Sequence, residues 1–306
     1  METVETEVAL AQSVCSRGLM TKPVTIRSLS VLTTAQTAWA ERAKVPLQRS
    51  GYAASLPDNL FLRRLHPDTE AEFRRGDGAE LSDKGSRPAK MRALLSSSAL
   101  AVNFFDVWRT EPKDKLAEAL GLPTPITQLS FEHKCLKYPV GPRSPNLDLE
   151  LKLTDGRRVG VESKFAEPYR HSAAGPCLSA KYFSGPEGRW DHVGLIRAQK
   201  LAGRLAAEWE FLDAAQLLKH LLGLASETPE KGTILLYLWY DAATDEAARH
   251  QREITRFAEA VAGDPVAFRA VSYQDVFSKL ERTLAEPQAG WLSYLSSRYF
   301  SPHDPV

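Results

Sequence analysis

The chain has 306 residues and a mass of 33.9 kDa, and its 39 Lys and Arg residues nearly balance its 38 Asp and Glu residues, which gives a formal net charge of +1. This balance excludes a histone-like protein that binds nucleic acid through a large uniform positive field, and it excludes an acidic disordered protein. Hydrophobic residues make up 43% of the chain, as in ordinary globular proteins, and the length suits one large domain or two smaller ones.

The cysteines and the N-terminus favour a cytoplasmic protein. Cys15, Cys135 and Cys177 are too widely spaced to indicate a disulfide framework or a zinc-binding motif. No apolar run reaches the ~18 residues of a membrane-spanning helix, so we expect no membrane partner. Acidic residues at the N-terminus, such as Glu2 and Glu5, argue against a secretory or transit peptide.

The N-terminal third predicts an extension followed by the start of a domain. We interpret residues 1–50 as a partly ordered extension with a helix around Thr34–Lys44, and residues 51–306 as a single domain. Gly51–Pro88 is rich in turn residues and charges, as a solvated surface would be. Helical periodicity follows over Met91–Phe105, and a second short helix over Asp114–Leu120 stops at Gly121.

Beyond this point the hydrophobic period changes to two, and then strands alternate with helices. Strands joined by short loops must run antiparallel, whereas strands reached through helical crossovers can run parallel to a neighbour. The sequence therefore predicts an α/β fold with a mixed central sheet and helices on its faces. The expected strands are Leu129–Tyr138, Leu147–Leu153, Arg158–Phe165, Thr233–Tyr240 and Ala267–Ser272, and the expected helices are Ile196–Leu222 (broken near Asp213), Asp245–Ala262, Gln274–Leu284 and Trp291–Phe300.

The most informative stretch is the predicted hairpin between Pro145 and Pro168, in which apolar and polar residues alternate strictly. The sequence Thr-Asp-Gly at its turn suits a three-residue loop with Gly156 in the left-handed conformation. A three-residue loop sets the register of the two strands so that Asp148 lies opposite Glu162, with Lys164 two residues further on the same face. A two-residue turn would shift the register and place Glu162 on the apolar face, which the alternation rules out.

This trio of side chains has a chemical use. Two neighbouring carboxylates repel each other unless a cation lies between them. Their hard oxygen atoms favour Mg²⁺ or Mn²⁺ over zinc, and such an ion activates a bound water and polarises a phosphodiester. A lysine beside the ion can position the attacking water or offset charge on phosphorus.

The pattern resembles the PD-(D/E)xK nuclease superfamily, in which an Asp on one strand is followed by Glu-x-Lys on the next. The resemblance spans about Met91 to Tyr240, and it implies a restriction-endonuclease-like three-layer α/β/α core: a helix, a three-strand antiparallel meander, a crossover helix and a further strand. Ser96–Phe105 is also similar to the first helix of restriction-endonuclease-like bacterial nucleases. By this resemblance Asp148 and Glu162 bind metal, and both act in catalysis together with Lys164 and Gln216.

The motif alone has low specificity, because an acidic residue followed by x-Lys occurs four times in the chain, starting at Glu111, Glu132, Glu150 and Glu162. Only the last follows a partner strand that carries an acidic residue and lies within an apolar alternation. The alternative interpretation is a solvent-facing hairpin whose polar face carries ordinary cross-strand charge pairs.

Further residues are weaker candidates. Gln216 and His220 share one face of the predicted crossover helix, which we expect to face the active site. The alternative is that this polar face is simply exposed to solvent. Glu132, on the first meander strand, is a candidate third acid or an ordinary strand charge. Basic and aromatic residues alternate in the loop after the predicted catalytic strand. This loop either binds substrate or is an ordinary surface loop. The candidate substrate-binding residues are Tyr169, Arg170 and Lys181.

The sequence therefore favours a Mg²⁺-dependent deoxyribonuclease, with Mn²⁺ as a substitute and DNA as the partner. A non-catalytic module that binds nucleic acid or protein on the same fold remains the alternative, and an enzyme that acts on a small phosphate ester is a third. Substrate form and oligomeric state, a homodimer included, stay open. A net charge near zero means that DNA affinity must come from a local cleft rather than from the whole surface.

Overall fold

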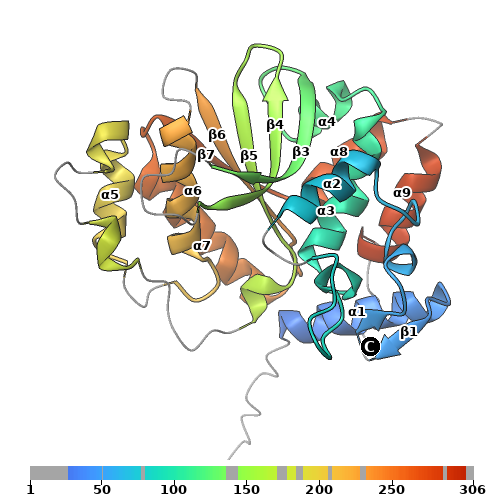
Figure 1. Cartoon of the computed structure of the whole chain (residues 1–306). Coiled ribbons are helices and arrows are strands. Elements are labelled where there is room, and N and C mark those ends of the chain that lie inside the picture. Colours follow the sequence, from blue (N-terminus) through green and yellow to red (C-terminus); the bar gives the residue numbers. More distant parts are fainter. Residues whose placement is uncertain are drawn as a thin grey trace, which may run out of the picture.

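Five strands form the central sheet of the computed structural model, in the order β3-β4-β5-β6-β7 (Figure 1). The structure describes residues 27–49, 51–76, 80–135, 144–170, 178–183, 189–205, 209–227, 232–284 and 288–300. The first three strands run antiparallel, and β6 and β7 run parallel to β5. This confirms the predicted mixed sheet, whose strands are β3 (Ile126–Lys134), β4 (Asn146–Leu153), β5 (Arg158–Lys164), β6 (Thr233–Trp239) and β7 (Val266–Ser272).

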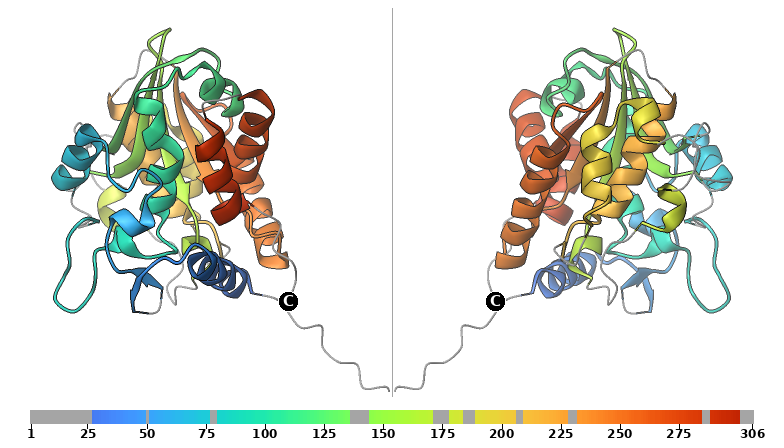
Figure 2. Two further views of the ribbon diagram at one scale, coloured as in Figure 1. Left: turned by 90° about the vertical axis from the view of Figure 1, so that its right-hand side faces the viewer. Right: turned by 90° about the vertical axis from the view of Figure 1, so that its left-hand side faces the viewer.

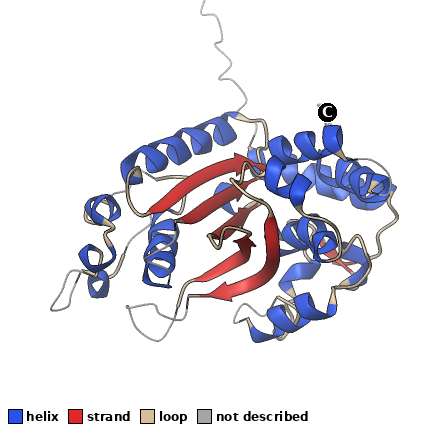
Figure 3. Cartoon of the chain, turned by 90° about the horizontal axis from the view of Figure 1, so that it is seen from above, coloured by secondary structure: helices blue, strands red, loops and turns tan. Residues whose placement is uncertain are grey.

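Helices cover both faces of this sheet (Figure 3). One face carries α5 (Ile196–Ala202), α6 (Ala214–Glu227) and α7 (Asp245–Val261), and the other carries α3 (Ser97–Phe105), α8 (Tyr273–Thr283) and α9 (Ala289–Leu295), which runs into a π-helical turn over Ser296–Phe300. All seven residues of β6 are buried, as its continuous apolar run predicts for a central strand. None of the helices in the described ranges is long and apolar enough to cross a membrane.

Several boundaries differ from the sequence-based prediction. α3 begins at Ser97 rather than near Met91, because the Ser96 hydroxyl caps the helix by accepting a hydrogen bond from the Ala99 amide at 3.1 Å. The predicted turn-rich surface contains a helix and a short hairpin. α4 (Asp114–Ala119) lies where it was expected, and the additional elements are β1 (Leu47–Arg49), β2 (Tyr52–Ala53) and α2 (Pro67–Arg75).

The β4–β5 hairpin has the predicted register over most of its length. Leu149 pairs with Val161, and Gly156 at the turn has a left-handed φ of +83°. The predicted alternation fails near the open end of the hairpin. A Cβ atom on Gly160 would lie 2.7 Å from a methyl carbon of Leu147 and 3.0 Å from one of Leu224 in α6. Leu147 therefore occupies space on the side of the sheet that α6 covers, where a polar face was expected.

The N-terminal helix α1 (Ser28–Arg42) lies across one end of the sheet, close to β1 (Figure 2). The guanidinium group of Arg298, only 1% exposed, connects α1 to the rest of the protein. It donates hydrogen bonds to Gln36 Oε1 at 3.2 Å and to Asn59 Oδ1 at 2.7 Å, and it stacks 4.1 Å from the ring centroid of Trp39. In return the Gln36 amide nitrogen donates to the Arg298 carbonyl at 2.8 Å. Residues 1–26 of the predicted extension lie outside the described residues.

We predict that Arg298→Ala lowers the free energy of unfolding by about 3 kcal/mol, because it leaves the buried acceptors on Gln36 and Asn59 without a donor. Arg252 on α7 is exposed, so the control Arg252→Ala should stay within about 0.5 kcal/mol of the wild type. Urea denaturation measures both variants. Equal stability of the two variants would show that Arg298 does not hold α1 in place.

Candidate active site

The polar face of the hairpin is buried under α6 rather than exposed. Glu150 is 4% exposed and Glu162 is 2% exposed. His220, on α6, is also 2% exposed. The alternative of a solvent-facing hairpin is therefore wrong at Glu150 and Glu162, because charged groups that are out of water need specific partners. A cross-strand ion pair is nevertheless present on this face, between Glu150 and Arg158, and Lys152 is exposed.

Glu162 has a basic side chain near each of its carboxylate oxygens. Lys164 Nζ lies 2.6 Å from Oε1, and His220 Nε2 lies 3.0 Å from Oε2. The contact between His220 Nε2 and Glu162 Oε2 is short enough for an ion pair but is not a hydrogen bond. Neither of these two atoms has a hydrogen-bond partner among the described residues. Lys164 Nζ also donates to Gln216 Oε1 at 2.9 Å. The structure thus brings together four residues that the sequence singled out.

The charges of this group hold one another in the ionised state. Burial alone would raise the pKa of Glu162, but Lys164 and His220 outweigh it and lower that pKa to about 2. Burial would likewise lower the pKa of Lys164, but the carboxylates of Glu162 and Asp148 raise it above its ordinary value. Lys164 is therefore a fixed cation at neutral pH and not a proton acceptor.

Asp148 faces a cavity of about 440 Å³ at the end of the sheet. Its Oδ2 atom accepts a hydrogen bond from the Ser163 amide at 2.7 Å. Burial raises the pKa of Asp148 well above its ordinary value, and the negative charge of Glu162 raises it further. Asp148 thus forms part of the cavity wall. Glu162 and Lys164 are not among the residues that line this cavity in the described ranges.

Glu132, the candidate third acid, lines the same cavity as Asp148. Its φ of +53° is unusual for a glutamate within a strand, and such strained residues gather at functional sites. The side-chain amide of Asn146 donates a hydrogen bond to Glu132 Oε2. Burial raises the pKa of Glu132 to about 7, despite this bond, and the charges of Glu80 and Glu162 raise it too.

Glu80 is a further acid of the cavity that no sequence pattern indicated. Glu80 is 9% exposed and accepts hydrogen bonds from Lys90 Nζ and from Ser98 Oγ, both at 2.9 Å. It lies in an irregular stretch with no hydrophobic period, so nothing in the sequence indicated that it folds onto the site. Asn146, two residues before Asp148, was expected to matter little because it is not a metal ligand, yet it supports Glu132 through its side-chain hydrogen bond.

The predicted substrate loop contributes one of its three named residues to the cavity. Arg170 is exposed and lines it. Tyr169 is 2% exposed and donates its hydroxyl hydrogen to the carbonyl of Tyr240 at 3.1 Å, so it belongs to the core. Lys181 is exposed outside the described cavity wall, with Nζ 5.6 Å from the ring centroid of Tyr182.

A divalent cation fits this group of side chains. The donors are carboxylate oxygens, which Mg²⁺ and Mn²⁺ prefer. The pKa values of Asp148 and Glu132 are both raised, which means that burial and neighbouring carboxylates outweigh the positive charge of Lys164 at Asp148 and of Lys90 at Glu132. Extra positive charge would relieve that imbalance. Asp148 and Glu162 would hold the ion, whereas Glu132 does not form with them a group of three ligand atoms within 4.8 Å of one another.

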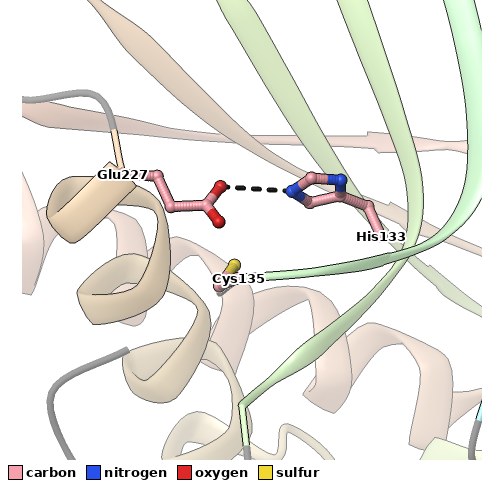
Figure 4. A group of neighbouring side chains, drawn as sticks. All are labelled: His133, Cys135 and Glu227. Atoms are coloured by element: carbon pink, nitrogen blue, oxygen red, sulfur yellow. Dashed lines mark hydrogen bonds and ion pairs between the residues drawn. The ribbon is translucent and has the colours of Figure 1, made fainter. Parts of the chain in front are cut away.

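A second group of potential metal ligands lies near the C-terminal end of α6 and consists of His133, Cys135 and Glu227 (Figure 4). Its position for a cation is already filled by Arg158, whose Nη2 atom lies 3.0 Å from Glu227 Oε2 and 2.9 Å from His133 Nε2. Burial raises the pKa of the Cys135 thiol to about 12, and Glu227 raises it further. This group is therefore better explained as a buried ionic network than as a metal site.

A known family matches most of the chain. The family described as "Restriction Endonuclease associating with ARP" (REase-ARP) matches residues 34–300. Neither a curated protein nor a solved structure matches the chain.

The raised pKa of Glu132 predicts how stability depends on pH. The folded state binds a proton up to about pH 7, whereas the unfolded state releases it near its ordinary pKa of 4.5. This component of the unfolding free energy should therefore fall as pH rises through that interval. Glu132→Gln should lack the component when unfolding is measured in EDTA. The exposed Glu118→Gln serves as the control and should retain it. Identical pH profiles for Glu132→Gln and the wild type would contradict the prediction.

Proposed function

The chain belongs to the family of restriction endonucleases associating with ARP, and from this membership we propose that it is a metal-dependent deoxyribonuclease that hydrolyses phosphodiester bonds at Asp148, Glu162 and Lys164. The observation that carries the proposal is the buried Glu162–Lys164 ion pair, at 2.6 Å, next to the cavity that Asp148 lines. The match supports a nuclease-like role in general, and the metal and the substrate are parts of the proposal.

Each residue has a distinct part in the proposed reaction. Asp148 and Glu162 bind the metal, and a bound Mg²⁺ or Mn²⁺ supplies a water of lowered pKa and a polarised phosphodiester. Because the neighbouring carboxylates keep Lys164 protonated, its ammonium group offsets negative charge that develops on the phosphoryl oxygens. It acts as an electrostatic group and not as the base.

Gln216 and His220 are positioning residues in this scheme. Gln216 accepts a hydrogen bond from Lys164 Nζ and so restricts where the ammonium group can point. His220 lies beside the carboxylate oxygen of Glu162 that Lys164 does not contact. Preorganised charges of this kind contribute to catalysis because they need no rearrangement during the reaction.

A second candidate function is a binding module without catalysis. The description of the family supports it, because that description names association with ARP. A binding module needs no metal, whereas the nuclease does. Thermal unfolding with and without Mn²⁺ separates the two, since a metal that binds only the folded state must raise the midpoint temperature.

We predict that the wild-type protein degrades DNA in Mg²⁺ or Mn²⁺ and that Asp148→Asn and Lys164→Ala reduce the rate by on the order of 10²–10³-fold. The matched control is Lys152→Ala. Lys152 ends another acidic-x-Lys sequence in the adjacent strand, but it is exposed and away from the cavity. Gel electrophoresis of labelled DNA gives the rates. Loss of activity in Lys152→Ala as large as in Lys164→Ala, or equal cutting by all variants, would refute the assignment.

A further inference from the structure

The cavity next to Asp148 has a second wall that does not belong to the α/β core. Thr33, Gln36 and Thr37 of α1 line it, together with Gly51 and Tyr52 at the β1–β2 turn. In two views α1 and β1 lie beyond the ends of the strands that carry the carboxylates (Figures 1 and 2). We propose that this wall admits an unpaired DNA strand to Asp148 and excludes an intact duplex, an inference that rests on the nuclease function proposed above.

The size of the cavity limits what can enter it. At about 440 Å³ it falls in the range of pockets for small ligands, roughly 300–1,000 Å³, which accommodates one or two nucleotides. The major groove of B-DNA is by itself about 12 Å wide and 8.5 Å deep. We therefore expect a duplex, which is wider than the cavity, to stay outside it, and an unpaired strand to extend into it towards Asp148.

The wall formed by α1 is fixed and does not behave as a lid. Gln36, which lines the cavity, also exchanges hydrogen bonds with Arg298 in both directions. At the start of the helix the Ser28 amide donates to Glu246 Oε2 at 2.8 Å. Both contacts are buried, so moving α1 away would break hydrogen bonds to two charged groups in the core.

The chemistry of the lining suits a single strand. The Arg87 and Arg170 side chains are exposed at the cavity, and neither forms an ion pair with a residue that the structure describes, which leaves them available for phosphates. Tyr52 supplies an aromatic ring at the same cavity, on which a base can stack. Stacking on an aromatic side chain requires a base released from its pairing partner.

Binding of fluorescein-labelled oligonucleotides, followed by anisotropy in EDTA, tests the inference without relying on cleavage. The probes are a single strand, a blunt duplex of the same sequence and that duplex with a central unpaired bubble. The single strand and the bubble should bind at least tenfold more tightly than the blunt duplex. Equal or tighter binding of the duplex would overturn the inference.

Variants connect the preference to the cavity. Tyr52→Ala should weaken single-strand binding about tenfold, and Tyr52→Phe should restore it because the ring remains. The control Phe183→Ala removes a 50% exposed aromatic side chain outside the described cavity wall and should bind as the wild type does. Equal losses in Tyr52→Ala and Phe183→Ala, or no loss in either, would contradict the assignment.

Cleavage assays with the same probes in Mn²⁺ keep the two proposals apart. Faster cutting of the single strand and the bubble supports both. Cutting of the blunt duplex at an equal rate overturns the strand preference and leaves the nuclease intact. If nothing is cut, the nuclease proposal fails, and the binding ratio alone decides whether the cavity selects unpaired DNA.

Discussion

The ion pair between Glu162 and Lys164 is the interaction on which the rest of the site depends. Burying a carboxylate is costly unless a cation lies close to it. Here Lys164 supplies the cation from the same strand, and His220 adds a basic side chain from α6. This arrangement requires α6 to pack tightly on β5. The buried pairing of β5 with β6 fixes the strand beneath the helix. The ion pair and the packing of α6 on the sheet therefore depend on each other.

That constraint also explains why the acids divide into two groups. The pKa of Glu162 is lowered beside Lys164, whereas the pKa values of Asp148 and Glu132, which line the cavity, are raised, so their ionised forms are disfavoured there. A bound cation would favour the ionised forms of both carboxyl groups, because it would supply positive charge close to them. The fixed wall of α1 then restricts which substrates reach these acids. The near-zero net charge is consistent with this picture, since the cations that matter for DNA lie locally at the cavity.

Much of this arrangement was predictable from local patterns. The alternation of the hairpin and its Thr-Asp-Gly turn predicted the register that pairs Leu149 with Val161. The continuous apolar run predicted the buried strand β6. Local patterns could not predict the irregularity around Glu132 and Leu147, because positive φ and side-chain packing depend on the neighbouring strands. Nor could they predict Glu80, which reaches the site through contacts with Lys90 and Ser98.

The most direct test of the central claim is a crystal structure of the protein soaked with Mn²⁺, in which anomalous scattering locates the ion. Our account predicts one strong peak between the carboxylates of Asp148 and Glu162, lost in Asp148→Asn crystals. A peak at His133, Cys135 and Glu227 instead, or no peak at a concentration that saturates Mn²⁺-dependent stabilisation, would contradict it.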